Sequence, residues 1–123
     1  MNQTTKLVKS IIKGLQEKKG KNIVVLDLSK ISGSICDYMV IAEGTSTTHV
    51  SALSDSVWDF ANKDLKEKPL YTNGTQLSEW IGIDYGTVLV HIFLNDLRLF
   101  YNLENLWADA KIKHIEEHEQ KTF

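Results

Sequence analysis

The residues with the clearest catalytic spacing lie near the C-terminus, where His114 and His118 flank Ile115 and two glutamates. On a helix, the H-x-x-E-H spacing places two histidines one turn apart, so that both can bind zinc while a glutamate activates water. No later segment supplies a third ligand, and no apolar wall surrounds the pair. We therefore expect no metal site and no hydrolase activity here. We interpret residues 111–123 as a charged, solvated helical tail.

A second pattern with possible chemistry is Gly33-Ser34 followed by Asp37. Nucleotidyltransferases place a Gly-Ser turn ahead of two carboxylates, which must aim at one point to hold magnesium for phosphoryl transfer. Here Met39 stands where the second carboxylate would be, and the spacing from the Gly-Ser pair is too short. The sequence also has neither a Walker-type loop nor G-x-G-x-x-G. We predict that the protein is not an enzyme and has no cofactor, with a residual nucleotidyltransferase kept as an alternative.

Cys36 is the only cysteine, which excludes an internal disulfide and suits a reducing compartment. Together with His49 or His91 it could form a thiol catalytic pair. A lone cysteine at the start of an apolar strand is more typical of a small buried hydrophobe. His91 lies within a strand whose alternation turns it away from Val90 and Ile92, which predicts a structural or surface role.

Three tryptophans, Trp58, Trp80 and Trp107, are candidates for either core packing or partner binding. Trp80 begins a strand and shares one face with Gly82 and Asp84, whereas Ile81 and Ile83 share the other. If only the isoleucine face is core, Trp80 is exposed, and exposed tryptophan is typical of a binding hot spot. Both interpretations of Trp80 stay open on periodicity alone. Trp58 is expected to pack or to lie on a partly covered helix flank.

The elements that must position these residues follow from hydrophobic periodicity. A first helix is predicted from the apolar spacing between Leu7 and Leu15, with Gly20 ending it. A second helix carries apolar residues from Val50 to Leu65, with Ser46 as its N-cap and Pro69 beyond its end. A third is predicted to begin at Asn95 or Asp96, with apolar positions at Leu97, Phe100, Leu103 and Trp107.

Four apolar runs predict strands, and the tight turn Asp84–Thr87 makes the last two an antiparallel hairpin. The predicted strands are Ile23–Leu28, Met39–Ala42, Trp80–Ile83 and Val88–Phe93. Because a helix returns between strands, the expected fold class is α/β, a mixed sheet flanked by helices.

Composition limits the protein to one domain and a short list of partners. The chain has 123 residues, with 42% hydrophobic and 24% charged, which is ordinary for one globular domain. The net charge of −2 argues against broad nucleic-acid or anionic-membrane binding and favours a protein partner, for which a basic surface would be complementary. No stretch has the length of a signal peptide or a membrane span, so we expect a cytoplasmic protein.

Four motifs in the same order and spacing resemble the Iojap ribosome-silencing family. Residues 80–93 resemble W-x-x-x-D-Y-G-D-V-x-V-H-x-F, and residues 98–110 resemble R-x-F-Y-x-L-E-x-L-W-x-D-A. Residues 37–46 resemble D-Y-x-V-I-x-x-G-x-S, and residues 49–53 fit H-V-x-A-L. The resemblance runs from about Leu7 to Ala110. Thr87 departs from the family's usual aspartate, and Asn73 stands where glutamate is common.

The resemblance implies a fold related to nucleotidyltransferases but without their catalytic carboxylates. It also implies binding to the large ribosomal subunit through its basic protein number fourteen, which faces the small subunit. Occupying that surface blocks subunit joining and represses translation when nutrients are scarce. A role in assembly of the large subunit is the alternative, and a homodimer is implied for the free protein.

We place the ribosome-silencing domain at residues 1–110 and expect its partner-binding surface to combine exposed aromatics with carboxylates. Carboxylates opposite a basic partner steer association and set register, whereas desolvated aromatic anchors supply most of the affinity. The residues predicted for this surface are Trp80, Asp84, Tyr85, Tyr101, Glu104 and Trp107. For Tyr101 and Trp107, packing of the last helix against the sheet is the competing interpretation.

Overall fold

A computed structural model describes residues 2–31, 33–34, 36–96 and 111–115. Helix α1 (Gln3–Glu17) is followed by strands β1 (Lys21–Asp27) and β2 (Tyr38–Gly44) and by helix α2 (Thr47–Leu65). Strands β3 (Tyr71–Asn73), β4 (Trp80–Asp84), β5 (Val88–Leu94) and β6 (Lys111–Ile115) complete the described elements. Of the predicted third helix, Asn95 and Asp96 are helical, and its apolar positions from Leu97 to Trp107 lie outside the described part.

The strands form one mixed six-stranded sheet in the order β3-β4-β5-β2-β1-β6. Only the β2–β5 pair is parallel among these neighbours, because α2 intervenes in sequence before the chain returns to the sheet. All four predicted strands lie in this sheet, which confirms the α/β fold class. The short β3 was not predicted, since three residues are too few to show a period.

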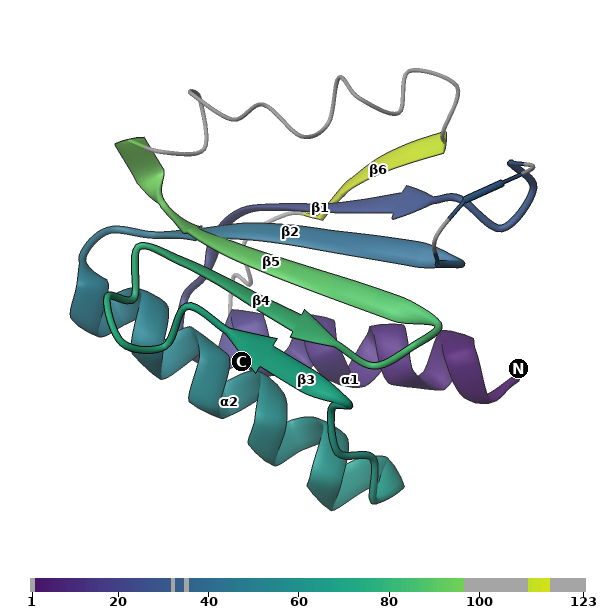
Figure 1. Cartoon of the computed structure of the whole chain (residues 1–123), viewed down its shortest axis with the longest axis horizontal. Coiled ribbons are helices and arrows are strands. Elements are labelled where there is room, and N and C mark those ends of the chain that lie inside the picture. The colour runs from purple at the N-terminus through teal and green to yellow at the C-terminus, as the bar shows by residue number, and fades with distance from the viewer. Residues whose placement is uncertain (1, 32, 35, 97–110, 116–123) are drawn as a thin grey trace, which may run out of the picture.

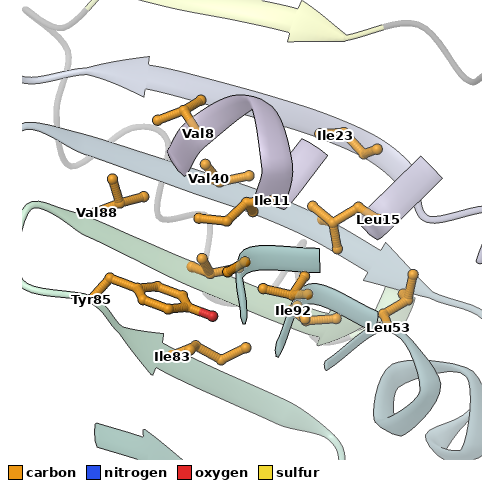
Figure 2. Packing of buried hydrophobic residues seen from close by; sticks show 14 of the residues in the cluster. Val8, Ile11, Leu15, Ile23, Val40, Leu53, Ile83, Tyr85, Val88 and Ile92 are labelled. Atoms are coloured by element: carbon orange, nitrogen blue, oxygen red, sulfur yellow. The ribbon is translucent and has the colours of Figure 1, made fainter. Parts of the chain in front are cut away.

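Both helices lie on the same side of the sheet (Figure 1). Their apolar stripes meet the inward side chains of β1, β2, β4 and β5, as Figure 2 shows for Ile11, Leu15 and Leu53 packed beside Val40 and Ile92. The opposite face of the sheet carries a second apolar cluster, made of Val24, Leu26, Leu28, Cys36, Met39, Ile41 and Phe93. Because both faces are apolar, β1 and β2 have buried residues on both sides.

The helix ends are set by local chemistry. The Asn2 side chain accepts a hydrogen bond from the Thr5 amide at the start of α1. Ser46 caps α2 as predicted, its hydroxyl oxygen accepting from the His49 amide at 3.0 Å. Lys66 ends α2 in the left-handed conformation.

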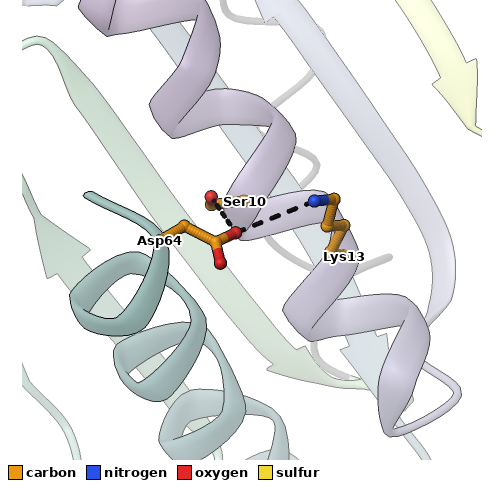
Figure 3. A network of polar contacts seen from close by, with 3 residues as sticks. All are labelled: Ser10, Lys13 and Asp64. Atoms are coloured by element: carbon orange, nitrogen blue, oxygen red, sulfur yellow. Dashed lines mark hydrogen bonds and ion pairs between the residues drawn. The ribbon is translucent and has the colours of Figure 1, made fainter. Parts of the chain in front are cut away.

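The two helices approach closely at Gly14. A Cβ on Gly14 would lie 2.8 Å from the carbonyl oxygen of Ser56, so only glycine fits this crossing. The Ser56 hydroxyl donates to the Gly14 carbonyl at 2.7 Å, and Asp64 accepts from Ser10 at 2.7 Å while lying 3.8 Å from the Lys13 ammonium (Figure 3). These polar contacts fix the position of α1 against α2.

The segment from Lys111 to Ile115 corrects the expectation of a solvated helical tail. It pairs with β1 as an antiparallel edge strand, β6, and four of its five residues are exposed. An edge strand needs only one neighbour and tolerates lysines on its outer side. Charge content therefore did not distinguish an edge strand from a tail, and residues 116–123 lie outside the described part.

Candidate functional site

The face of the sheet opposite α1 and α2 carries Trp80 and Asp84, two of the three predicted site residues that the structure describes. In β4, Ile81 and Ile83 are buried toward the helices, whereas Trp80, Gly82 and Asp84 are partly exposed on the other face. The strand alternation predicted from the sequence is thereby confirmed. Tyr101, Glu104 and Trp107 lie outside the described residues.

Trp80 is half-buried and held by two aromatic neighbours on β5. Its ring stacks on Phe93 with 4.9 Å between centroids, and its indole Nε1–H donates to His91 Nδ1 at 3.0 Å. The register pairs Trp80 with Phe93 and Gly82 with His91, which brings these side chains together. Trp80 therefore packs against the sheet and also remains partly exposed, so core packing and partner binding are both compatible with its position.

His91 has the structural role that alternation predicted. Indole nitrogen is only a donor, so His91 Nδ1 must be unprotonated to accept from it. Burial lowers the pKa of His91 to about 4. The imidazole is thus neutral at physiological pH and serves as a fixed acceptor for Trp80.

Tyr85 corrects the prediction that it is an exposed aromatic. It is 7% exposed and packs in the core between the helices and the sheet (Figure 2). Its amide donates to the Val88 carbonyl at 2.9 Å, so the residue lies in the turn while its ring points inward. Strand alternation does not extend into a turn, so the predicted direction of the Tyr85 side chain was wrong. Burial also raises the pKa of the Tyr85 hydroxyl.

Three carboxylates, Asp27, Asp37 and Asp84, lie at one end of the sheet, which we call the acidic end. Asp27 pairs in register with Tyr38, and the Asp37 amide donates to the Thr87 carbonyl at 2.9 Å in the turn that Asp84 begins. Asp84 accepts from the Gly86 amide at 2.7 Å, which orients its carboxylate. A hydrogen bond from Ser29 lowers the pKa of Asp27. Lys111 lies opposite Asp27 in the β1–β6 register and Lys30 is also near it, so Asp37 and Asp84 are the carboxylates that this end offers to a basic partner.

The described residues do not group these or other side chains into a metal site. No three His, Cys, Asp or Glu side chains in that part of the chain are placed to hold an ion. His114 lies in β6, so the helical geometry that H-x-x-E-H requires is not present at that histidine. Cys36 is buried, as predicted, and burial raises the pKa of its thiol, which disfavours the nucleophilic thiolate.

Three exposed apolar residues were missed by the sequence reasoning. Leu70, Tyr71 and Leu77 are 75%, 62% and 72% exposed and lie on or beside β3. Leu77 lines a hollow of about 520 Å³ that Trp80 also borders, formed with residues 72–76 and Glu79. The signal available in the sequence was the uncharged run from Leu70 to Ser78, which follows Pro69. Trp58, by contrast, is the partly covered helix residue that was expected, at 40% exposed.

A family model described as "Ribosomal silencing factor during starvation" matches residues 1–123. The chain belongs to the ribosomal silencing factor family. A Bacillus subtilis protein named ribosomal silencing factor RsfS is 32% identical over 117 residues, which is 94% of this chain and 96% of that protein. The family is defined by ribosomal silencing and is not a class of enzymes.

A solved structure from Chromobacterium violaceum has the same fold as this chain. Its TM-score is 0.79 at 31% identity, and the match covers 96% of this chain and 98% of that chain. A more distant relative is the mouse protein named mitochondrial assembly of ribosomal large subunit protein 1. It is 28% identical over 96 residues, which is 76% of this chain and 42% of that protein. Both silencing and assembly names thus occur among relatives of this domain.

No helix in the described ranges is both long and apolar enough to cross a membrane.

Proposed function

We propose that this silencing factor binds the large ribosomal subunit through its protein number fourteen and sterically blocks joining of the small subunit. Translation is repressed in this way when nutrients are limited, and the site of action is the cytoplasm. Membership of the silencing family carries the proposal. The acidic end of the sheet supports it, because a basic ribosomal protein is attracted to clustered carboxylates.

The proposed contact surface runs along β4 from Trp80 to Asp84 and takes in the hollow beside Leu77. Trp80 offers a large ring that is already held in place by Phe93 and His91, so little side-chain entropy is lost on binding. Asp84 offers a carboxylate oriented by the Gly86 amide. Tyr101, Glu104 and Trp107 remain predicted members of this surface, and Tyr85 is removed from it because its ring is buried.

Cosedimentation with purified large subunits tests the proposal. We expect the parent protein to bind, and Asp84→Asn to bind more weakly. Asparagine keeps an oxygen that can accept from the Gly86 amide, so only the charge is lost. Trp80→Ala is expected to cost roughly 2 kcal/mol or more of binding.

Trp80→Ala needs a control for folding, because the ring also contacts Phe93 and His91. Trp58→Ala is the matched variant: the same substitution at a partly exposed tryptophan on α2, on the other side of the sheet. Urea unfolding of both variants separates lost binding from lost folding. If Trp80→Ala remains folded and binds as tightly as Trp58→Ala, Trp80 is not an anchor.

The alternative function is assembly of the large subunit, which the name of the mouse relative favours. Depletion of an assembly factor causes immature large-subunit particles to accumulate during rapid growth, whereas loss of a silencing factor changes subunit joining in starved cells. Profiles of ribosomal particles under the two conditions distinguish these roles. A homodimer of the free protein, implied by the family resemblance, is tested by sedimentation equilibrium.

A further inference from the structure

Charge is distributed very unevenly along this mildly acidic chain. The first 21 residues contain six lysines and one glutamate, for a net charge of +5. The remaining 102 residues contain eight basic and fifteen acidic residues, for a net charge of −7. The overall charge of −2 therefore conceals a basic segment, and such asymmetry is typical of proteins that contact nucleic acid with one part of their surface.

Helix α1 displays these lysines on the side that faces away from the core. Lys6, Lys9 and Lys13 are three and four residues apart, which places them along one helical face, and all three are exposed. The buried stripe of α1, which includes Ile11 and Leu15, lies on the opposite side of the helix. Lys18 and Lys19 are exposed just beyond the helix end. We call Lys6, Lys9 and Lys13 the basic face.

The composition of the basic face indicates what it binds. Residues 1–21 contain no aromatic residue and no arginine, and the exposed positions of α1 are lysine, glutamine and glutamate. A protein partner requires desolvated apolar or aromatic anchors, and bases are recognised by stacking or by arginine forks. Lysine ammonium groups alone suit phosphates, which they contact as point charges without reading sequence.

We propose that the basic face of α1 binds the phosphate backbone of ribosomal RNA, independently of its sequence, when the protein is bound to the large subunit. This inference rests on the proposed function and adds a second contact to it. Helix α1 packs on one face of the sheet, whereas Trp80 packs against the apolar cluster on the other face. The RNA contact and the aromatic contact can thus be removed separately, and the acidic end of the sheet remains available to the basic ribosomal protein.

The test compares two double variants of the full chain that remove the same charge. Lys6→Gln/Lys9→Gln removes two lysines from the basic face and leaves Lys13, which pairs with Asp64. Lys63→Gln/Lys68→Gln is the control, since both lysines are exposed and lie near the C-terminal end of α2. Binding to purified large subunits is measured from about 50 to about 200 mM salt. Each lost phosphate contact reduces the slope of log affinity against log salt by roughly 0.7 to 0.9.

If Lys6→Gln/Lys9→Gln loses two phosphate contacts, the parent should bind more tightly than this variant at low salt. The ratio of the two affinities should fall about tenfold as the salt rises from about 50 to about 200 mM. The control should follow the parent. If the parent binds and both double variants keep its slope, the inference is wrong and the proposed function stands. If the parent itself does not bind large subunits, the proposed function is wrong.

An RNA duplex of arbitrary sequence identifies the class of partner. The parent and the Lys63→Gln/Lys68→Gln control should bind it weakly at low salt, and Lys6→Gln/Lys9→Gln should bind it several-fold less. A different result would overturn the RNA assignment: Lys6→Gln/Lys9→Gln binds large subunits less tightly, yet neither the parent nor either double variant binds the duplex. The basic face would then contact an acidic protein.

Discussion

Protonation of His91 should destabilise the fold as the pH falls, because the folded protein holds this imidazole neutral. Its Nδ1 accepts from Trp80 at 3.0 Å, and its pKa is lowered from 6.5 to about 4 by burial. Above pH 6.5 both the folded and the unfolded chains have a neutral His91, and the stability contribution is fully present. Between pH 6.5 and 4 only the unfolded chain gains the proton, so the free energy of unfolding decreases.

The size of this effect follows from the difference between the two pKa values. Each pKa unit corresponds to about 1.4 kcal/mol, so the free energy of unfolding should fall by about 3 kcal/mol between pH 6.5 and 4 through His91 alone. Carboxylates also titrate at the lower end of this range. The effect must therefore be measured as a difference between the parent and a variant that lacks the imidazole.

Urea unfolding followed by circular dichroism, at pH values between 7 and 4.5, measures that difference. His91→Gln keeps an oxygen that can accept from the Trp80 indole and removes the titrating group. We expect it to lose some stability at pH 7 and to lose less than the parent as the pH falls, so that the two curves converge. His114→Gln, on exposed β6, controls for the loss of an imidazole as such. Parallel curves for the parent and His91→Gln would refute the reasoning.

Four further substitutions test the packing and the N-cap of α2. In thermal melts, Gly14→Ala should destabilise the protein by roughly 1–3 kcal/mol, because the added Cβ would lie 2.8 Å from the Ser56 carbonyl oxygen. Gly82→Ala is the control and should be tolerated, because no atom would lie nearer than 3.8 Å to its Cβ. Tyr85→Phe should be neutral or stabilising by up to about 1 kcal/mol in urea unfolding, because the buried Tyr85 hydroxyl has no hydrogen-bond partner among the described residues; a clear loss would show that the hydroxyl is bonded. Ser46→Ala should cost about 1 kcal/mol through loss of the α2 N-cap, and an unchanged melting temperature would contradict that role.

Much of the fold was predictable because long elements repeat a pattern. The helical spacing from Leu7 to Leu15 and the alternation from Trp80 to Ile83 both appear in the structure as buried stripes. Short or edge elements carry too little pattern, which is why β3 was missed and β6 was predicted to be a tail. Edge strands are paired on one side only, so charged residues are permitted there.

The candidate site was predictable only in part. Alternation correctly placed Trp80 and Asp84 on one face, but it could not show that Trp80 is held by Phe93 and His91, which are distant in sequence. Tyr85 was placed on the wrong side, because a turn residue has no periodic rule for its direction. Contacts between distant segments require the register of the sheet, and a single sequence does not specify it.

The most direct test of the silencing mechanism is the joining of purified ribosomal subunits, followed by light scattering. Large subunits are first incubated with the protein and then mixed with small subunits. We expect joining to fall in proportion to the protein until it reaches one copy per large subunit, and Asp84→Asn to be a weaker inhibitor. Unchanged joining at saturating protein, with binding to large subunits confirmed in the same sample, would contradict the steric mechanism.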